Sequence, residues 1–248
     1  MSDISKSPAR IAGMFDRIAP RYDFLNHLLS AGLDKRWRER AVTELALSPG
    51  ARVVDLCTGT ADVALAIAAA RSTPGARRVV GVDFAGAMLN VGLAKLRRAG
   101  LADRITLVRG DAARIPVADR SVDAITIAFG IRNVEDTAAA CAEMARVLRP
   151  GGRIAILEFA IPTLPLVRQG YLWYFKHVLP LIGRLVSRHD AAYGYLPASV
   201  SAFASPDEFV TILRQAGFTE IRAVPLSLGI VYLYMVVGRE SLVAGRKS

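Results

Sequence analysis

From about residue 50 onward, short apolar runs alternate with longer segments that have the apolar periodicity of a helix. This alternation predicts successive strand and helix units that build a parallel sheet. Strands are expected over residues 52–56, 78–83, 105–109, 122–129 and 153–159, and helices over 61–68, 87–98 and 137–148. Pro150, Gly151 and Gly152 are expected to end the last helix, since proline cannot continue it. The chain is therefore assigned to the α/β class.

Segments on either side extend this core into one expected domain, residues 1–248, because α/β folds often reach this length as a unit. The predicted parts are a helical cover (10–47), a cofactor-binding core (50–160), a helical insertion (164–205), and a capped helix with two strands (206–238).

The loop from Asp55 to Thr60, after the first predicted strand, indicates a ligand site. Small residues there bring backbone N–H groups close to a ligand at the carboxyl end of the strand. Gly59 allows close approach, and Thr58 and Thr60 offer hydroxyls. Many nucleotide-binding folds share such a loop, so the loop alone does not identify the ligand. Residues after the following predicted strands are needed for that.

Two further acidic residues follow the next predicted strands. Asp83 is placed to accept both hydroxyls of a ribose, with a helix cap as the alternative role. Asp111 is placed to meet an adenine amino group, with a plain turn as the alternative. Gly59 is the only glycine in the first loop, whereas dinucleotide folds prefer three, and no P-loop pattern is present. These features favour a nucleoside without pyrophosphate, namely S-adenosylmethionine.

Composition narrows the partners and the compartment. The net charge of +10 suggests an anionic partner, but scattered basic residues and the lack of a recognition motif argue against nucleic acid. Two distant cysteines predict neither a metal site nor a disulfide. The polar N-terminus has no signal-peptide core, and the longest apolar stretch, 226–238, is too short to span a bilayer. A cytoplasmic protein is expected, with any membrane contact peripheral, on the inner face of the cytoplasmic membrane.

Several segments together resemble the class I methyltransferases and, more closely, the ubiquinone/menaquinone biosynthesis C-methyltransferase family. They are Met14 to Asn26, Trp37-Arg38, the Asp55 loop, Phe129 to Val134, Val147 to Gly152, Leu157 to Phe159, Tyr193 to Ser199, Phe203 and Ala216 to Phe218. The resemblance covers roughly residues 10–238. It implies a Rossmann-like, seven-strand methyltransferase sheet with an N-terminal helical cover and a helical insertion after strand five.

The resemblance also implies the chemistry: S-adenosylmethionine-dependent C-methylation of a polyprenyl quinol ring. The implied substrate is demethylmenaquinol or the 2-polyprenyl-6-methoxy-1,4-benzoquinol of ubiquinone biosynthesis, without a metal. Many family members carry serine at the position of Ala128, so one hydroxyl contact to the cofactor is lost here. The expected cofactor-binding residues are Asp55, Gly59, Thr60, Asp83, Phe84, Asp111, Ala112 and Ala128.

By the same resemblance, Arg132 and Asn133 are contacts to the substrate ring. Tyr22, because of its place on the N-terminal cover, is expected to close over the cofactor and is grouped with them as catalytic. Arg132 would stabilise the developing phenolate while Asn133 orients it. The alternatives are that Arg132 forms an ion pair with Glu135 or Glu158, and that Tyr22 simply packs.

The insertion, from Leu164 to about Leu185, combines aromatic and apolar residues with Arg168, Lys176, Arg184 and Arg188. Either a helix lying at anionic headgroups or a lid over the core fits this pattern. Competing functions are methylation of another lipid or small molecule, such as a phospholipid amine or sterol, and a non-catalytic scaffold in a quinone-synthesis complex. A homodimer is left open.

Overall fold

The structure, a computed structural model, describes residues 6–70, 78–179, 181 and 190–238. Its strands form one seven-stranded sheet in the order β3-β2-β1-β4-β5-β7-β6, in which β7 is antiparallel to both its neighbours. The strands are β1 (Arg52–Leu56), β2 (Arg78–Asp83), β3 (Ile105–Arg109), β4 (Val122–Ala128), β5 (Leu148–Phe159), β6 (Glu220–Leu226) and β7 (Val231–Val237). The predicted Rossmann-like seven-strand sheet is confirmed.

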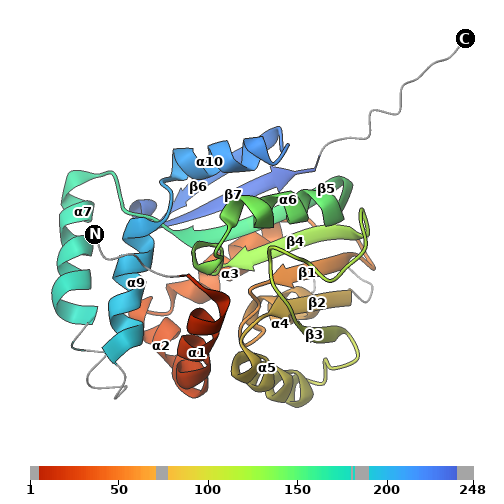
Figure 1. Cartoon of the computed structure of the whole chain (residues 1–248), viewed down its shortest axis with the longest axis horizontal. Helices are drawn as coiled ribbons and strands as arrows, with labels where there is room; N and C mark the ends of the chain where they lie inside the picture. The colour runs from red at the N-terminus through yellow and green to blue at the C-terminus, as the bar shows by residue number, and fades with distance from the viewer. Residues whose placement is uncertain (1–5, 71–77, 180, 182–189, 239–248) are drawn as a thin grey trace, which may run out of the picture.

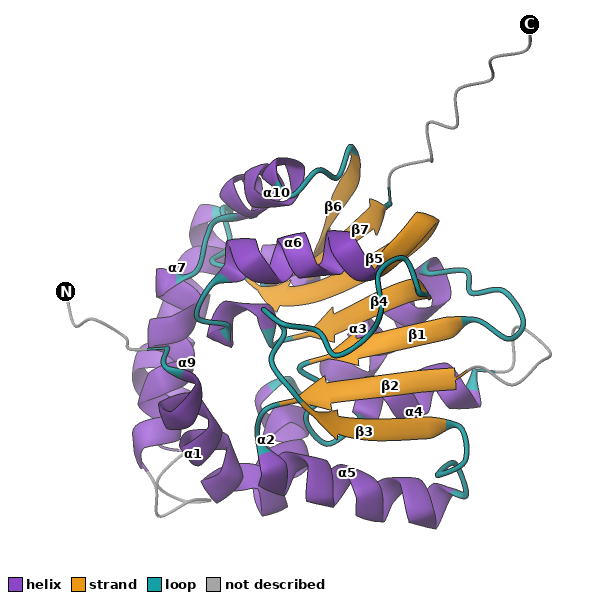
Figure 2. Cartoon of the chain, turned by 45° about the vertical axis from the view of Figure 1, so that its right-hand side comes forward, coloured by secondary structure: helices purple, strands orange, loops and turns teal. Residues whose placement is uncertain are grey.

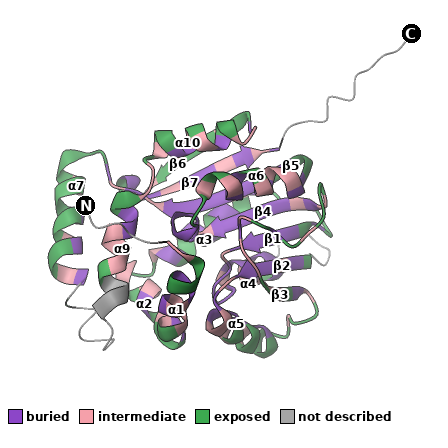
Figure 3. Ribbon diagram, viewed as in Figure 1, coloured by how far each residue is buried: buried purple, intermediate pink, exposed green. Residues whose placement is uncertain are grey.

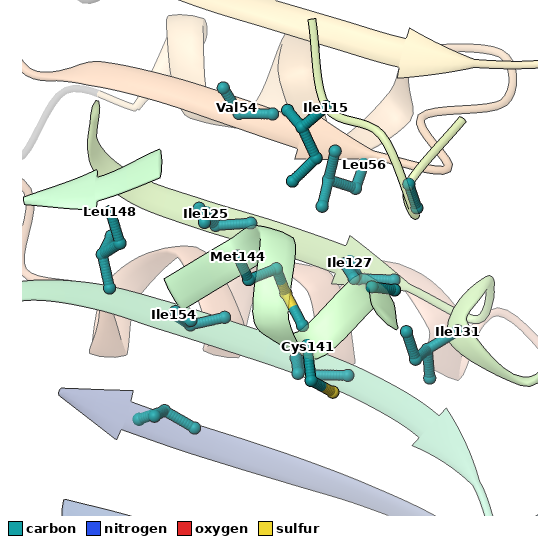
Figure 4. Close-up of a cluster of buried hydrophobic side chains, with 14 of the residues drawn as sticks. Val54, Leu56, Ile115, Ile125, Ile127, Ile131, Cys141, Met144, Leu148 and Ile154 are labelled. Atoms are coloured by element: carbon teal, nitrogen blue, oxygen red, sulfur yellow. The ribbon is translucent and has the colours of Figure 1, made fainter. Parts of the chain in front are cut away.

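Helices cover both faces of the sheet because its inner strands are apolar on both sides. On one face, α6 (Thr137–Val147) packs on side chains such as Leu56 and Ile125 (Figure 4), and α10 (Pro206–Gln215) lies next to α6 and β6 (Figure 1). On the other face, α3 (Leu33–Glu44), α4 (Asp62–Ala69) and α5 (Gly86–Ala99) pack on the alternate residues, Val53 and Ala124 among them. This alternation follows from the two-residue period of a strand.

The N-terminal helical cover and the insertion both lie at the end of the sheet where the parallel strands finish (Figure 2). Figure 2 shows α1 (Pro8–Ile18), α2 (Tyr22–Leu29), α7 (Pro165–Trp173) and α9 (Asp190–Ala202) near the arrowheads of the parallel strands. A 3₁₀ turn, η1 (Ala19–Arg21), joins α1 to α2, and a π-helical turn, η3 (Tyr174–Val178), continues α7. Both segments are helical where described, as predicted; Arg184 and Arg188 lie outside the described residues.

The predicted start of the fifth strand is wrong, whereas the other predicted strands and helices of the core differ from the structure by at most one residue at either end. The fifth strand begins at Leu148 instead of Arg153, because buried Leu148 already pairs with Val122. The register then shifts before Ala124 pairs with Arg153. The proline and glycines therefore form an irregular stretch inside β5, in which Gly151 has a φ of +71°.

Candidate active site

Asp55, at the end of β1, shapes the first loop from inside. It is 1% exposed, and its two carboxylate oxygens accept hydrogen bonds from the hydroxyls of Thr58 (2.5 Å) and Thr126 (2.6 Å). Burial raises the pKa of Asp55 to about 6, although both hydroxyls oppose the shift. Asp55 thus joins the loop to β4, and the Thr58 hydroxyl is directed at Asp55.

Asp83, at the end of β2, lies across from this loop. Its carboxylate accepts the backbone N–H groups of Gly59 and Ala85, each at 2.9 Å. Burial raises its pKa, and these N–H groups oppose the shift. The first turn of α5 is capped instead by Asp16 of α1, which accepts the N–H of Ala87 at 2.8 Å. Asp83 is therefore not the N-cap of α5, although its side chain holds the N–H of the N-cap residue Ala85 in the turn before the helix.

Polar contacts fasten the N-terminal cover to the core beside the loop. The Thr60 hydroxyl donates to Asp23 of α2 at 2.5 Å, and the Lys95 ammonium of α5 lies 2.8 Å from the other Asp23 oxygen. Lys95 also pairs with Asp62, which accepts a hydrogen bond from Arg38 at 3.0 Å. The Thr60 hydroxyl thus holds the cover in place, and its predicted contact with the cofactor stays a prediction.

After β3, Asp111 makes a local turn in which its side chain accepts the N–H of Ala113 at 2.9 Å. Ala112 is buried in the core cluster under α6. The plain turn that the sequence left as the alternative is present, and the second oxygen of Asp111 leaves room for a further donor. Its predicted role in adenine binding stays a prediction.

Two of the loops approach each other closely at the centre of the site. A Cβ on Gly130 would lie 2.3 Å from the Cβ of Cys57, so only glycine fits beside the first loop. Phe129, just before it, has a left-handed backbone with a φ of +61°. Its ring lies 4.6 Å from that of Phe159 and 6.0 Å from that of Trp37, measured between centroids.

Arg132 follows in a short 3₁₀ turn, η2 (Ile131–Asn133), and is 5% exposed. Its Nη1 lies 2.6 Å from Glu158 Oε1, and its guanidinium stacks over the Phe159 ring at 5.5 Å. Burial disfavours the charge, but Glu158, together with Tyr22 and Tyr195, raises the pKa of Arg132 above its ordinary value, so Arg132 remains a cation. The ion pair with Glu158, one of the alternatives from the sequence, is therefore present.

Two pockets meet at this point. A narrow cleft is lined by Phe15, Tyr22, Cys57, Gly59, Asp83, Phe84, Met88, Ala128, Phe129, Gly130 and Asn133. Beside it lies a larger, mainly apolar cavity of about 420 Å³, with residues such as Leu25, Trp37, Arg132, Tyr171, Phe175 and Ile230 on its walls. Phe15, Tyr22 and Phe129 line both, so they form the partition between them.

Arg132 and Asn133 are neighbours in sequence but line different pockets: Arg132 lines the apolar cavity, and Asn133 lines the cleft. Tyr195 of α9 lines the cavity and donates its hydroxyl to Asn133 Oδ1 at 2.9 Å. Tyr22 lies on the partition, and burial raises the pKa of its phenol. The structure thus brings together the three residues predicted to be catalytic. Of the predicted cofactor set, Gly59, Asp83, Phe84 and Ala128 line the cleft.

Sequence reasoning missed Tyr195 and Tyr171 as site residues. Both come from the insertion, whose helical period did not say which side chains face the core. Glu158 was named only as an ion-pair partner, although its place at the end of a strand is the same signal that marked Asp55 and Asp83.

Sheet order, the Asp83 cleft and the adjoining cavity define a Rossmann-like enzyme of the class I methyltransferase type. An S-adenosylmethionine-dependent methyltransferase from Aquifex aeolicus has the same fold, with a TM-score of 0.59 at 20% identity, covering 83% of this chain and 90% of that one.

Sequence comparison identifies the family. The model of the ubiE/COQ5 methyltransferase family matches residues 3–237, and the chain belongs to that family of methyltransferases. A Syntrophotalea carbinolica protein named ubiquinone/menaquinone biosynthesis C-methyltransferase UbiE is 52% identical over 89% of this chain and 91% of its own. A Lactiplantibacillus plantarum protein named demethylmenaquinone methyltransferase is 40% identical over 85% and 88%.

Among the described residues, the structure has neither a membrane-spanning helix nor a cluster of metal ligands. No helix there is long and apolar enough to cross a bilayer. No group of three or more histidine, cysteine, aspartate or glutamate side chains among the same residues is arranged to hold a metal ion.

The buried carboxyl of Asp55 predicts a particular pH dependence of stability. Its pKa rises from an ordinary 3.8 to about 6 on folding, so the native state binds the proton more tightly than the unfolded state. Between these values the free energy of unfolding should fall as pH rises, by up to about 3 kcal/mol, relative to an Asp55→Asn variant that lacks this titration.

Guanidinium unfolding of both proteins at several pH values measures the difference. Thr126→Val, which removes one hydroxyl donor to Asp55, should enlarge it. A difference between wild type and Asp55→Asn that is constant with pH would contradict the prediction.

Proposed function

We propose that this methyltransferase transfers a methyl group from S-adenosylmethionine to a ring carbon of a polyprenyl quinol. Demethylmenaquinol is the preferred substrate, and the benzoquinol intermediate of ubiquinone biosynthesis is the second. The names of the relatives support this proposal. The observation that carries it is the apolar cavity, which meets the Asp83 cleft at an aromatic partition and has the Arg132 cation on its wall.

The residues of the cleft fit the cofactor. Asp83 Oδ1 and Oδ2 each hold one backbone N–H, and a carboxylate oxygen can accept a second donor such as a ribose hydroxyl. Gly59, with a φ of +55°, allows the backbone to approach a nucleoside. When bound, S-adenosylmethionine supplies an electrophilic methyl on its sulfonium. Asp111 and Ala112, at the next strand end, would bind the adenine.

As folded, the cleft is narrow, with a volume of about 30 Å³. The Met88 side chain and the rings of Phe15 and Tyr22 line it. A nucleoside needs more room, so Met88, which is flexible, and the cover must give way when it binds. The contacts of Asp16 with Ala87 and of Asp23 with Thr60 fasten the cover and would resist this movement.

On the substrate side, the protein holds the ring and stabilises charge. Loss of the quinol hydroxyl proton makes the neighbouring ring carbon nucleophilic, and Arg132 stabilises the phenolate that develops. Its raised pKa makes Arg132 a hydrogen-bond donor and rules it out as the proton acceptor. Asn133, fixed by Tyr195, orients the reacting side of the ring, and Tyr22 closes the partition.

The direct test is incubation of the protein with methyl-labelled S-adenosylmethionine and short-chain forms of both reduced substrates. The label is expected on a ring carbon of the naphthoquinol, with lower kcat/KM for the benzoquinol. Label on oxygen, or on neither substrate while a phospholipid amine or sterol is methylated, would overturn the proposal.

Arg132→Lys tests the role of the guanidinium while it leaves a cation beside the buried Glu158. A lysine cannot reproduce the planar fork, so we expect kcat to fall by about 100-fold or more. Calorimetry should find the affinity for S-adenosylmethionine changed by less than about threefold, because Arg132 lies on the cavity side of the partition. Equal losses in kcat and in cofactor affinity would instead assign Arg132 a structural role.

We further propose that α7 rests on an anionic membrane surface, from which the substrate enters the cavity. The helix exposes the apolar side chains of Leu166 (84%) and Trp173 (61%) and the basic Arg168, and exposed Lys176 follows in η3; Figure 3 shows much of α7 as exposed. Its inner face carries Val167 and Tyr171 on the cavity wall. The same helix can therefore close the cavity and contact lipid.

Co-sedimentation with vesicles of phosphatidylglycerol and phosphatidylcholine tests this contact. Leu166→Glu should reduce the bound fraction several-fold by removing an apolar contact and adding a like charge to that of the lipid. The matched control is Leu93→Glu on α5, which changes the charge equally at another exposed leucine. Equal binding of the two variants would remove α7 from the membrane contact.

A further inference from the structure

Tyr171, on the inner face of α7, carries a buried hydroxyl that its neighbours leave unsatisfied. The residue is 8% exposed and lines the apolar cavity, yet its hydroxyl has no hydrogen-bond partner among the described residues. Its ring is fixed by packing on Phe175, with centroids 4.2 Å apart. Buried polar groups are almost always paired, so such an exception needs an explanation.

Other hydroxyls on the cavity wall are already bonded within the protein. Tyr174 donates to the carbonyl of Leu29 at 3.2 Å, and Tyr195 donates to Asn133 at 2.9 Å. Ser30 donates to Asp34 at 2.8 Å, and Ser227 accepts the indole N–H of Trp37 at 3.0 Å. Tyr171 therefore differs from these groups because its hydroxyl takes part in no hydrogen bond, as donor or as acceptor, among the described residues.

We propose that Tyr171 donates a hydrogen bond to an oxygen of the substrate ring and so positions the ring in the cavity. This assignment rests on the proposed function, because a quinol brings an oxygen into an otherwise apolar space. Burial raises the pKa of Tyr171, so the phenol keeps its proton and acts as a donor. Tyr171 and Arg132 line the same cavity, so a ring bound there can be contacted by both side chains.

Tyr171→Phe removes the hydroxyl and keeps the ring that packs on Phe175. We expect kcat/KM for a short-chain quinol to fall about tenfold, the usual effect of losing one hydrogen bond to a ligand. The melting temperature should stay equal or rise, since no protein hydrogen bond is lost. The matched control is Tyr234→Phe, a tyrosine buried in the core under α10 that lines neither pocket, which should leave kcat/KM unchanged.

A binding measurement separates this proposal from the proposed function. Trp37 lines the cavity, so quenching of its fluorescence can report binding of a short-chain prenyl naphthoquinone and of the same prenyl naphthalene without ring oxygens. Tyr171→Phe should bind the quinone about tenfold more weakly and the hydrocarbon equally well.

Equal affinity of both proteins for the quinone, or an equal loss for both ligands, overturns the assignment of Tyr171. If the wild-type protein binds the quinone through Tyr171 but methylates neither quinol, the proposed function fails and the hydrogen bond stands. If methylation occurs and the variant retains both kcat/KM and quinone affinity, the proposed function stands and the hydrogen bond fails.

Discussion

The buried ion pair between Arg132 and Glu158 links the segments that build the site. Glu158, at the end of β5, accepts the backbone and guanidinium N–H groups of Arg132 and the N–H of Phe159. Arg132 also donates to the carbonyl of Phe129 and, through Nε, to Ser199 of α9. Burying two charges is costly and such a pair is weak evidence for stability. Its position on the cavity wall agrees with the proposed role of Arg132, in which the guanidinium presents a cation to the substrate.

Carboxylates also determine how the cover and the core act together. Asp55 and Asp83 shape the first loop from within the sheet. From the cover, Asp23 reaches this loop and Asp16 reaches the start of α5. The cover thus contacts the Gly59 loop and the start of α5, the two elements that would face a nucleoside. At the proposed cofactor site, binding would therefore be linked to the position of the cover, because movement of the cover would break these hydrogen bonds.

The sequence predicted the sheet well because buried parallel strands are nearly continuous apolar runs, and β1, β2 and β3 have the expected bounds. It also located Asp83 and Arg132, since the ends of parallel strands meet at one edge. It could not predict partners that come from distant segments, such as Asp16 with Ala87, which are 71 residues apart. The sequence also could not predict that the Tyr171 hydroxyl has no hydrogen-bond partner, because helical periodicity does not show which polar groups are paired in the fold.

The aromatic partition explains why two such different pockets lie side by side. A charged cofactor and an apolar quinol need different surroundings, yet the methyl donor and ring carbon must come within about 3–3.5 Å. Phe129 holds its ring in the partition by a left-handed backbone, and Gly130 allows the loop to pass against Cys57. A bound substrate that displaces water from beside these rings would leave a low local dielectric, in which the proposed stabilisation of a phenolate by Arg132 would be stronger than in solvent.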